Sequence, residues 1–207
     1  MIQRGNLGFY KHGNLPHLDT ADAIQFVTFV LADAAPRFQM KRNSLGIGMR
    51  SSEESILNDR ILDQGKGTCM LGSPSIANIV LRSILLNDGY SHETLAWVIM
   101  PNHVHLLLTQ KKDNRLGSIV KQIKAGSTRN IRRLRQTSEA IWQRGYFDRM
   151  IRSPEHLLKT VTYIHRNPVK AGLVGCPRDW QFSSCHTFNP IATAARLGLP
   201  EDWFDAE

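Results

Sequence analysis

Two histidines, His103 and His105, stand one residue apart inside the apolar run at residues 97–108. Such a run is typical of a buried β-strand, in which side chains alternate between the two faces of the sheet. Both imidazoles therefore point to one side, while Val104 points to the other. Two converging imidazoles make half of a divalent-metal site. The sequence thus predicts a second half-site elsewhere, and the best candidate is the segment 163–167.

The segment 163–167 belongs to a predicted helix that Ser153 can cap and that Pro154 can begin. The buried stripe of this helix consists of Leu157, Leu158, Val161 and Ile164. At about 100° per residue, Tyr163 lies roughly 150° from the centre of that stripe, and Asn167 lies about 40° from Tyr163. We therefore expect both side chains to project from the side of the helix that avoids its core. Pro168 predicts that the helix ends at Asn167.

A tyrosine and an asparagine one turn apart suit the roles of nucleophile and metal ligand. A phenol has a pKa near ~10 and is a poor nucleophile at neutral pH, so the scissile phosphate must be polarised. A Mg²⁺ or Mn²⁺ ion held by His103, His105 and Asn167 would do this, and the mixed nitrogen and oxygen donors favour Mn²⁺, with Mg²⁺ as its abundant substitute. Attack by Tyr163 would give a phosphotyrosine ester, which a second hydroxyl could resolve without ATP.

Two residues compete for these roles. His165 is an alternative ligand, although it lies two residues from Tyr163 and points elsewhere on a helix. Among the four tyrosines, Tyr146 is the rival nucleophile, with substrate stacking or packing as its other interpretations. The sequence at residues 65–68 (GKGT) looks like a phosphate loop but lacks the residues that a Walker motif requires, so nucleotide hydrolysis is not supported.

The chain has a net charge of +8, from 26 Lys and Arg against 18 Asp and Glu. The excess gathers at residues 111–135, where nine cations face Asp113 alone, and this pattern indicates a polyanion as partner. A helix predicted over residues 116–134 carries a core stripe (Leu116, Ile119, Val120, Ile123, Ile131 and Leu134) on one face. We predict phosphate contacts from its cations Lys121, Lys124, Arg129, Arg132, Arg133 and Arg135.

The remaining pattern alternates strands and helices within one domain over residues 1–207. We expect strands at 25–31, 94–108 and 141–151, and helices at 52–62 and 74–86, the latter capped by Ser73. A polar insertion lies near residues 32–53 and an acidic tail near 190–207. The three cysteines are odd in number, which favours reduced thiols. We find no signal peptide and no run of bilayer length, so we expect a soluble, cytoplasmic, nucleoid-associated protein with no membrane partner.

Three segments closely resemble one known family. Residues 95–108 (LAWVIMPNHVHLLL), 141–152 (IWQRGYFDRMIR) and 163–174 (YIHRNPVKAGLV) resemble the single-tyrosine HUH transposases of the REP-associated branch. These enzymes are related to the transposases of hairpin-ended insertion sequences. Weaker likeness at residues 15–17, 26–29 and 180–184 extends the resemblance to about three quarters of the chain. The sequence departs from the family mainly between Ala32 and Glu53.

The resemblance implies a ferredoxin-like α+β domain, with an antiparallel sheet, helices packed on one face and the histidine pair on a central strand. It also implies that His103, His105 and Asn167 bind the metal and that Tyr163 is the nucleophile. The expected function is metal-dependent cleavage and rejoining of single-stranded DNA near hairpins, through a covalent 5′-phosphotyrosine intermediate, by a monomer or homodimer. The alternative is a domesticated, non-enzymatic nucleic-acid-binding protein of the same fold.

Overall fold

A four-stranded antiparallel sheet forms the centre of the computed structural model, which describes residues 8–12, 15–19, 23–34, 62–111 and 114–197. The strand order is β4-β5-β3-β6, from β3 (Ile24–Val30), β4 (His92–Ile99), β5 (His103–Gln110) and β6 (Phe147–Met150). Helix α2 (Pro74–Leu85) lies between β3 and β4 in the chain, and α3 (Leu116–Arg135) lies between β5 and β6. This βαββαβ order is the ferredoxin-like arrangement, so the predicted α+β class is confirmed.

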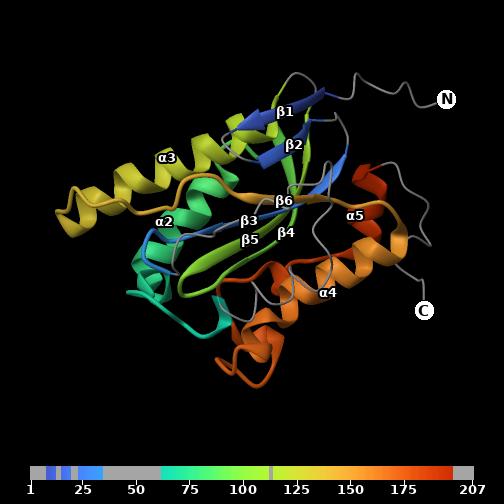
Figure 1. The fold of residues 1–207 in the computed structure, drawn as a ribbon. Helices are drawn as coiled ribbons and strands as arrows, with labels where there is room; N and C mark the ends of the chain where they lie inside the picture. The colour runs from blue at the N-terminus through green and yellow to red at the C-terminus, as the bar shows by residue number, and fades with distance from the viewer. Residues whose placement is uncertain (1–7, 13–14, 20–22, 35–61, 112–113, 198–207) are drawn as a thin grey trace, which may run out of the picture.

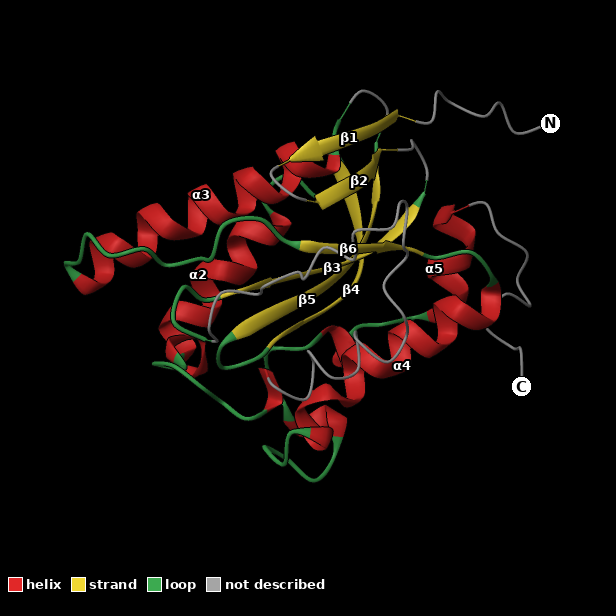
Figure 2. Cartoon of the chain, in the orientation of Figure 1, coloured by secondary structure: helices red, strands yellow, loops and turns green. Residues whose placement is uncertain are grey.

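The sheet carries helices on its two faces (Figures 1 and 2). Helices α2 and α3 cover one face, where they pack on alternate strand residues such as Val27 and Val104. Helix α4 (Pro154–Lys170) covers the opposite face, where Phe26 and Leu107 belong to a second core cluster. The helices of the ferredoxin-like unit thus share one face, as predicted, and α4 closes the other. Alternation along β3 and β5 supplies apolar side chains to both clusters.

Shorter elements complete the described chain. Strands β1 (Gly8–His12) and β2 (Leu15–Asp19) pair with each other in a separate two-stranded sheet. Three 3₁₀ turns, η1 (Met70–Gly72), η2 (Pro177–Asp179) and η3 (Ser184–His186), and helix α5 (Pro190–Leu197) account for the remaining regular structure. None of the described helices is both long and apolar enough to cross a bilayer.

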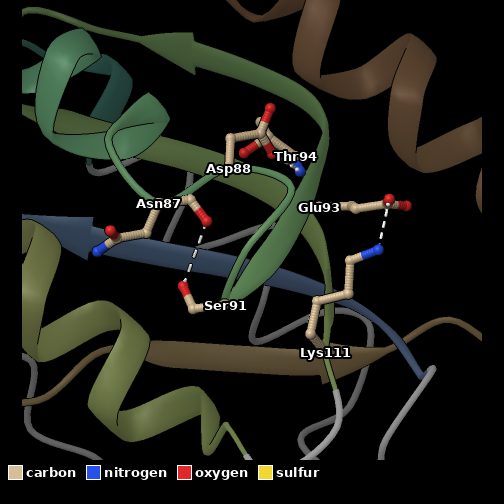
Figure 3. Close-up of polar contacts among 6 residues, drawn as sticks. All are labelled: Asn87, Asp88, Ser91, Glu93, Thr94 and Lys111. Carbon is tan, nitrogen blue, oxygen red and sulfur yellow. Dashed lines mark hydrogen bonds and ion pairs between the residues drawn. The ribbon is translucent and has the colours of Figure 1, made fainter.

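Polar contacts fix the start of β4 (Figure 3). The backbone N–H of Thr94 donates to Asp88 Oδ1 at 2.6 Å, and Ser91 Oγ donates to the Asn87 carbonyl at 3.4 Å. Lys111 Nζ lies 2.7 Å from Glu93 Oε1 and joins the start of β4 to the end of β5. The first two contacts order the turn that leads into β4, and the Lys111–Glu93 ion pair supports the alignment of β4 on β5.

The predicted histidine strand at residues 94–108 is wrong in its extent, because it forms two strands rather than one. Strands β4 and β5 pair as an antiparallel hairpin in which Ile99 faces Val104. The chain reverses at Pro101, which has no N–H to donate to a strand partner. The Met100 N–H closes the turn by donating to the His103 carbonyl at 2.9 Å. Both histidines nevertheless lie at the beginning of an interior strand.

Three other local predictions need correction. The strand expected at 141–151 is only β6, because Gly145 adopts a positive φ of 75° and turns the chain. Leu134 is 52% exposed rather than buried, since it lies in the final turn of α3, next to the end of the helix. Ser73 occupies the N-cap position of α2, but its side chain makes no capping hydrogen bond and contacts Ser75 Oγ instead.

Helix α4 also departs from its predicted end. It continues past Asn167 to Lys170, with Pro168 inside the helix. A proline this close to the C-terminus removes one backbone hydrogen bond, and the end is closed by Ala171 N donating to the Asn167 carbonyl and Leu173 N donating to that of Pro168. Residues 52–61 of the helix predicted at 52–62, most of the insertion near 32–53 and the end of the acidic tail lie outside the described residues.

Candidate active site

Strand β5 places His103 and His105 on the sheet face that α4 covers. The side chain of Val104 points the other way, into the cluster under α2 and α3. Both imidazoles are almost fully buried, with exposed fractions of 1% and 0%. Their Nε2 atoms lie 3.1 Å apart, so the two rings converge through the same atom type. The predicted half-site is therefore present as a geometric feature.

Asn102 determines which nitrogen of His103 carries the proton. Its Nδ2 donates to the carbonyls of Leu62 at 3.0 Å and Lys66 at 3.2 Å, which leaves Oδ1 as an acceptor. Oδ1 lies 2.7 Å from His103 Nδ1, so that nitrogen must be the donor. The neutral ring consequently presents a lone pair at Nε2, toward His105. A buried amide beside a ligand histidine is the kind of partner that orients metal-binding imidazoles.

His105 is held by its neighbours on β3. Thr28 lies opposite His105 in the β3–β5 register, and its Oγ1 is 2.8 Å from His105 Nδ1. Phe26 stacks on the imidazole with a centroid separation of 5.2 Å and an interplanar angle of 26°. A hydroxyl can accept or donate, so the Nδ1 proton can face Thr28 when Nε2 serves as a ligand.

Burial keeps both imidazoles uncharged. Desolvation, with a smaller repulsion from Lys170, lowers the pKa of His103 to about 3. Desolvation also places the pKa of His105 well below its ordinary value, with further lowering by His103 and Lys170. A histidine must be neutral to bind a metal ion, so this environment keeps both rings in their ligand form at neutral pH.

Helix α4 carries Tyr163 to the same point. Ser153 caps the helix by accepting from the His156 N–H at 3.1 Å, and Pro154 stands in its first turn, as predicted. Tyr163 Oη lies 3.3 Å from His105 Nε2. The ring packs edge-on against Phe26 at 6.0 Å between centroids, and is half-buried. The structure therefore brings the predicted nucleophile to the predicted metal half-site.

Asn167 lies one turn beyond Tyr163 but is fully buried, so the expectation that it projects away from the core is wrong. Thr160, two turns earlier on nearly the same line of the helix, is buried as well, because the buried surface of α4 extends around this side. Among the described residues, neither Oδ1 nor Nδ2 of Asn167 has a hydrogen-bond partner. An unpaired buried amide is costly, which is the property expected of a ligand side chain whose ion is not part of the structure.

The donor set fits a divalent cation. The part of the chain that the structure describes contains no group of three or more His, Cys, Asp or Glu residues placed to hold an ion. The oxygen of the buried Asn167 amide is a third donor of a kind that Mg²⁺ and Mn²⁺ accept. Two donors that occupy adjacent octahedral positions ~2.1 Å from one ion are roughly 3.0 Å apart, close to the observed Nε2 separation. His103, His105 and the orphaned Asn167 oxygen are thus the residues that would hold it.

The two competing residues lie elsewhere. His165 Nε2 is 2.9 Å from Ser184 Oγ, and its ring packs against Phe188. Burial lowers the pKa of His165 to about 4. Tyr146 belongs to the core cluster under α2 and α3, on the face opposite Tyr163. These positions indicate structural roles for both residues.

A lysine and an aspartate at the site were missed by the sequence reasoning. Lys170 Nζ lies 5.4 Å from the centroid of the Tyr163 ring and 3.4 Å from Asp63 Oδ2. Desolvation raises the pKa of Asp63, against the opposing effect of Lys170. The signal for Lys170 was its place two helical turns after Tyr163. No local signal pointed to Asp63, which is distant in sequence.

The basic helix α3 lies on the face of the sheet opposite the histidines (Figure 1). Lys121, Arg129, Arg133 and Arg135 are exposed, whereas Arg132 is half-buried and donates from Nε to the Glu139 carbonyl. Lys124 donates to the carbonyls of Gln143 at 2.6 Å and Gly145 at 2.7 Å, and burial lowers its pKa to about 8. Lys124 therefore holds the 143–145 turn, and the exposed cations remain the predicted DNA contacts.

The sequence has relatives whose similarity to it includes the region of this site. A profile of the family described as "Transposase IS200 like" matches residues 80–167, which include both histidines, Tyr163 and Asn167. A curated protein of Haemophilus influenzae that carries the name REP-associated tyrosine transposase is 33% identical over 126 residues, which cover 56% of this chain and 69% of that protein. The chain belongs to the REP-associated tyrosine transposases.

Two further comparisons agree with this family. The REP-associated tyrosine transposase of Escherichia coli K12 is 33% identical over 112 residues, 54% of this chain and 62% of its own length. A solved structure described as a REP-associated tyrosine transposase bound to a REP hairpin superposes with a TM-score of 0.52 and 22% identity, covering 95% of this chain and 91% of that one. At that identity the structural likeness shows the fold that this member shares.

Proposed function

We propose that this member of the family is a metal-dependent endonuclease and strand transferase that cleaves and rejoins single-stranded DNA near hairpins. The observation that carries the proposal is the meeting of the Tyr163 hydroxyl with the His103–His105 pair, at 3.3 Å from His105 Nε2. The fully buried amide of Asn167, which has no hydrogen-bond partner among the described residues, supports it further. A bound Mg²⁺ or Mn²⁺ would polarise the scissile phosphate and stabilise the charge that develops on its oxygens.

Tyr163 supplies the nucleophile in the proposed reaction. Its Oη forms a bond to the phosphorus while the bond from phosphorus to the 3′ oxygen of the upstream nucleotide breaks. The phenol proton is released, and the departing oxygen takes up a proton to become a free 3′-hydroxyl. The 5′ end stays on the protein as a phosphotyrosine ester. A 3′-hydroxyl from another strand can then attack the ester, which rejoins DNA and restores the phenol without ATP.

The proposed DNA partner is a single strand with a palindromic hairpin. The related transposase of known structure is bound to a REP hairpin. The chain has a net charge of +8, and the exposed cations of α3 supply a surface suited to phosphates. A monomer or a homodimer is compatible with this proposal.

The non-enzymatic alternative does not account for the site. A binding module gains nothing from an unpaired amide held in a protein interior, where each unsatisfied polar group costs on the order of 1–3 kcal/mol. It also has no use for two imidazoles that converge at 3.1 Å beside a tyrosine hydroxyl. The cost of these features favours the enzyme.

A covalent-adduct assay tests the proposed function. Single-stranded DNA hairpins with flanks, taken from palindromes beside the gene, are incubated with the protein and Mn²⁺ or Mg²⁺, then resolved under denaturing conditions. We expect an adduct that Tyr163→Phe abolishes and EDTA prevents. Tyr90→Phe is the matched control, because Tyr90 is 83% exposed and lies in the turn before β4. An adduct that persists in Tyr163→Phe, or none on any such hairpin, would contradict the proposal.

A further inference from the structure

Three cations share one line of α4 with Tyr163. Lys159 precedes the tyrosine by one turn, whereas Arg166 and Lys170 follow it at three and seven positions. At 100° per residue these four side chains fall within a sector of about 60°. The line from Lys159 to Lys170 is about 16 Å long at 1.5 Å per residue. We call this set of residues, Lys159, Tyr163, Arg166 and Lys170, the α4 stripe.

The α4 stripe borders a hollow on the protein surface. The hollow has a volume of about 620 Å³, and all four residues of the stripe line it, together with Leu158, Thr162 and Val169. Arg166 and Lys170 are exposed, whereas Tyr163 is half-buried at the inner side. The lining of the hollow thus combines cations with apolar and hydroxyl groups, which suits a ligand that has both charged and apolar parts.

The charges of the stripe are only partly compensated. Lys159 pairs with the exposed Glu155 one turn earlier, and Lys170 Nζ lies 3.4 Å from Asp63 Oδ2. Within the described ranges, no carboxylate forms an ion pair with the exposed guanidinium of Arg166. Fully exposed pairs such as Lys159–Glu155 contribute little and exchange readily for another anion. The stripe therefore offers positive charge on both sides of the tyrosine.

We propose that the α4 stripe binds the backbone of the unpaired DNA segment that contains the scissile phosphate, with Lys170 nearest to that phosphate. The inference rests on the proposed function and adds the path of the strand. The Tyr163 hydroxyl lies beside two imidazoles that are at most 1% exposed, so only an unpaired strand is slender enough to bring a phosphorus there. The basic face of α3 lies on the other side of the sheet and is left for the hairpin (Figure 1).

The test measures binding without cleavage, so that it does not depend on the reaction. The parent is Tyr163→Phe in EDTA, and the probes are a hairpin with single-stranded flanks and the same hairpin with a blunt end. Affinity is measured by fluorescence anisotropy between roughly 50 and 200 mM salt. The variants Arg166→Gln and Lys170→Gln remove stripe cations. Arg82→Gln is the control, since Arg82 is an exposed cation on α2, across the sheet.

Each stripe variant should lower the salt slope for the flanked hairpin by about 0.7, the value for one phosphate contact on a single strand. When the salt concentration rises fourfold, a variant that lacks one such contact should therefore lose about 2.6-fold less affinity than the parent loses. The blunt hairpin should show the parental slope with each stripe variant. Arg82→Gln should affect the flanked and the blunt hairpin alike, because α2 lies beside α3 on the face assigned to the hairpin. An unchanged slope in both stripe variants would overturn the proposal. An equal decrease on the blunt hairpin would assign the stripe to duplex binding and overturn it too.

The outcome is separable from that of the proposed function. A protein that forms no adduct can still show the slope changes, because the binding parent lacks the nucleophile. If the protein forms the Tyr163 adduct but the stripe variants show no change of salt slope, the proposed function stands and the proposed path of the strand is wrong.

Discussion

Asn167 has no hydrogen-bond partner among the described residues, which leads to a prediction about stability. Replacing it with leucine, a side chain of similar size, removes two buried polar atoms that have lost their hydration. Each such atom costs on the order of 1–3 kcal/mol. Part of that cost is offset by imperfect packing of the new side chain, so we expect Asn167→Leu to stabilise the metal-free protein by about 1–3 kcal/mol.

Asn102 is the matched control for this change. It is also an asparagine with about 1% exposure, but its amide makes three hydrogen bonds, to Leu62, Lys66 and His103. Asn102→Leu leaves two carbonyls and a ring N–H without partners, and should destabilise the protein by about 3 kcal/mol or more. The two asparagines are thus expected to respond to the same substitution with opposite signs.

The assay is urea unfolding in EDTA and in excess Mn²⁺. An ion that binds only the folded state stabilises it, by about 2.7 kcal/mol at a hundred times its Kd. Asn167→Leu should reduce that increment by at least about 1.4 kcal/mol, which corresponds to a tenfold weaker affinity. Asn167→Asp, which retains an oxygen donor, should restore it. Destabilisation of Asn167→Leu in EDTA to the extent of Asn102→Leu, or an undiminished Mn²⁺ increment, would refute the reasoning.

Two further predictions concern buried charge. Burial lowers the pKa of His103 from about 6.5 in the unfolded chain to about 3 in the folded protein, so near pH 5 only the unfolded state binds its proton. The free energy of unfolding therefore decreases as the pH falls below 6.5, by about 2 kcal/mol at pH 5 for this imidazole alone. Urea midpoints in EDTA from pH 7.5 to 5 measure this, and a flat profile would contradict it. Lys124→Met should destabilise the protein by about 1–3 kcal/mol, because it leaves the carbonyls of Gln143 and Gly145 unpaired. The salt slope of hairpin binding should be unchanged in Lys124→Met but reduced in Arg129→Gln, and the reverse pattern would count against this assignment.

The elements around the site could largely be predicted from sequence, because local patterns determine them. The Phe-, Val- and Thr-rich composition of β3 and the capped amphipathic pattern of α4 each depend on residues close together in the chain. The convergence of His103 and His105 followed from the alternation of side chains along β5. Pro101 marked the hairpin turn, but its effect was outweighed by the long apolar run around it. Local sequence patterns thus predict well which face of a strand or helix a side chain occupies, and predict less well where a strand ends.

Contacts between distant segments were not predictable. The hydrogen bonds of Asn102 to Leu62 and Lys66 depend on how the loop before η1 lies against the β4–β5 turn. The burial of Asn167 depends on how α4 lies across the sheet, which the helix's own periodicity does not contain. Asp63 reaches Lys170 for the same reason. These side chains determine the tautomer, desolvation and charge of the site, so its chemistry needed the tertiary structure.

Helix α4 carries both the nucleophile and the amide donor, while the sheet carries the two imidazoles. The proposed centre is consequently complete only while this single helix lies on the sheet. If α4 separated from the sheet, the tyrosine and one metal donor would leave together, so a half-assembled site with its nucleophile still in place does not arise. The same linkage constrains any exchange of α4 between two copies of the chain. If one copy placed its Tyr163 in the site of the other, its Asn167 would move there as well.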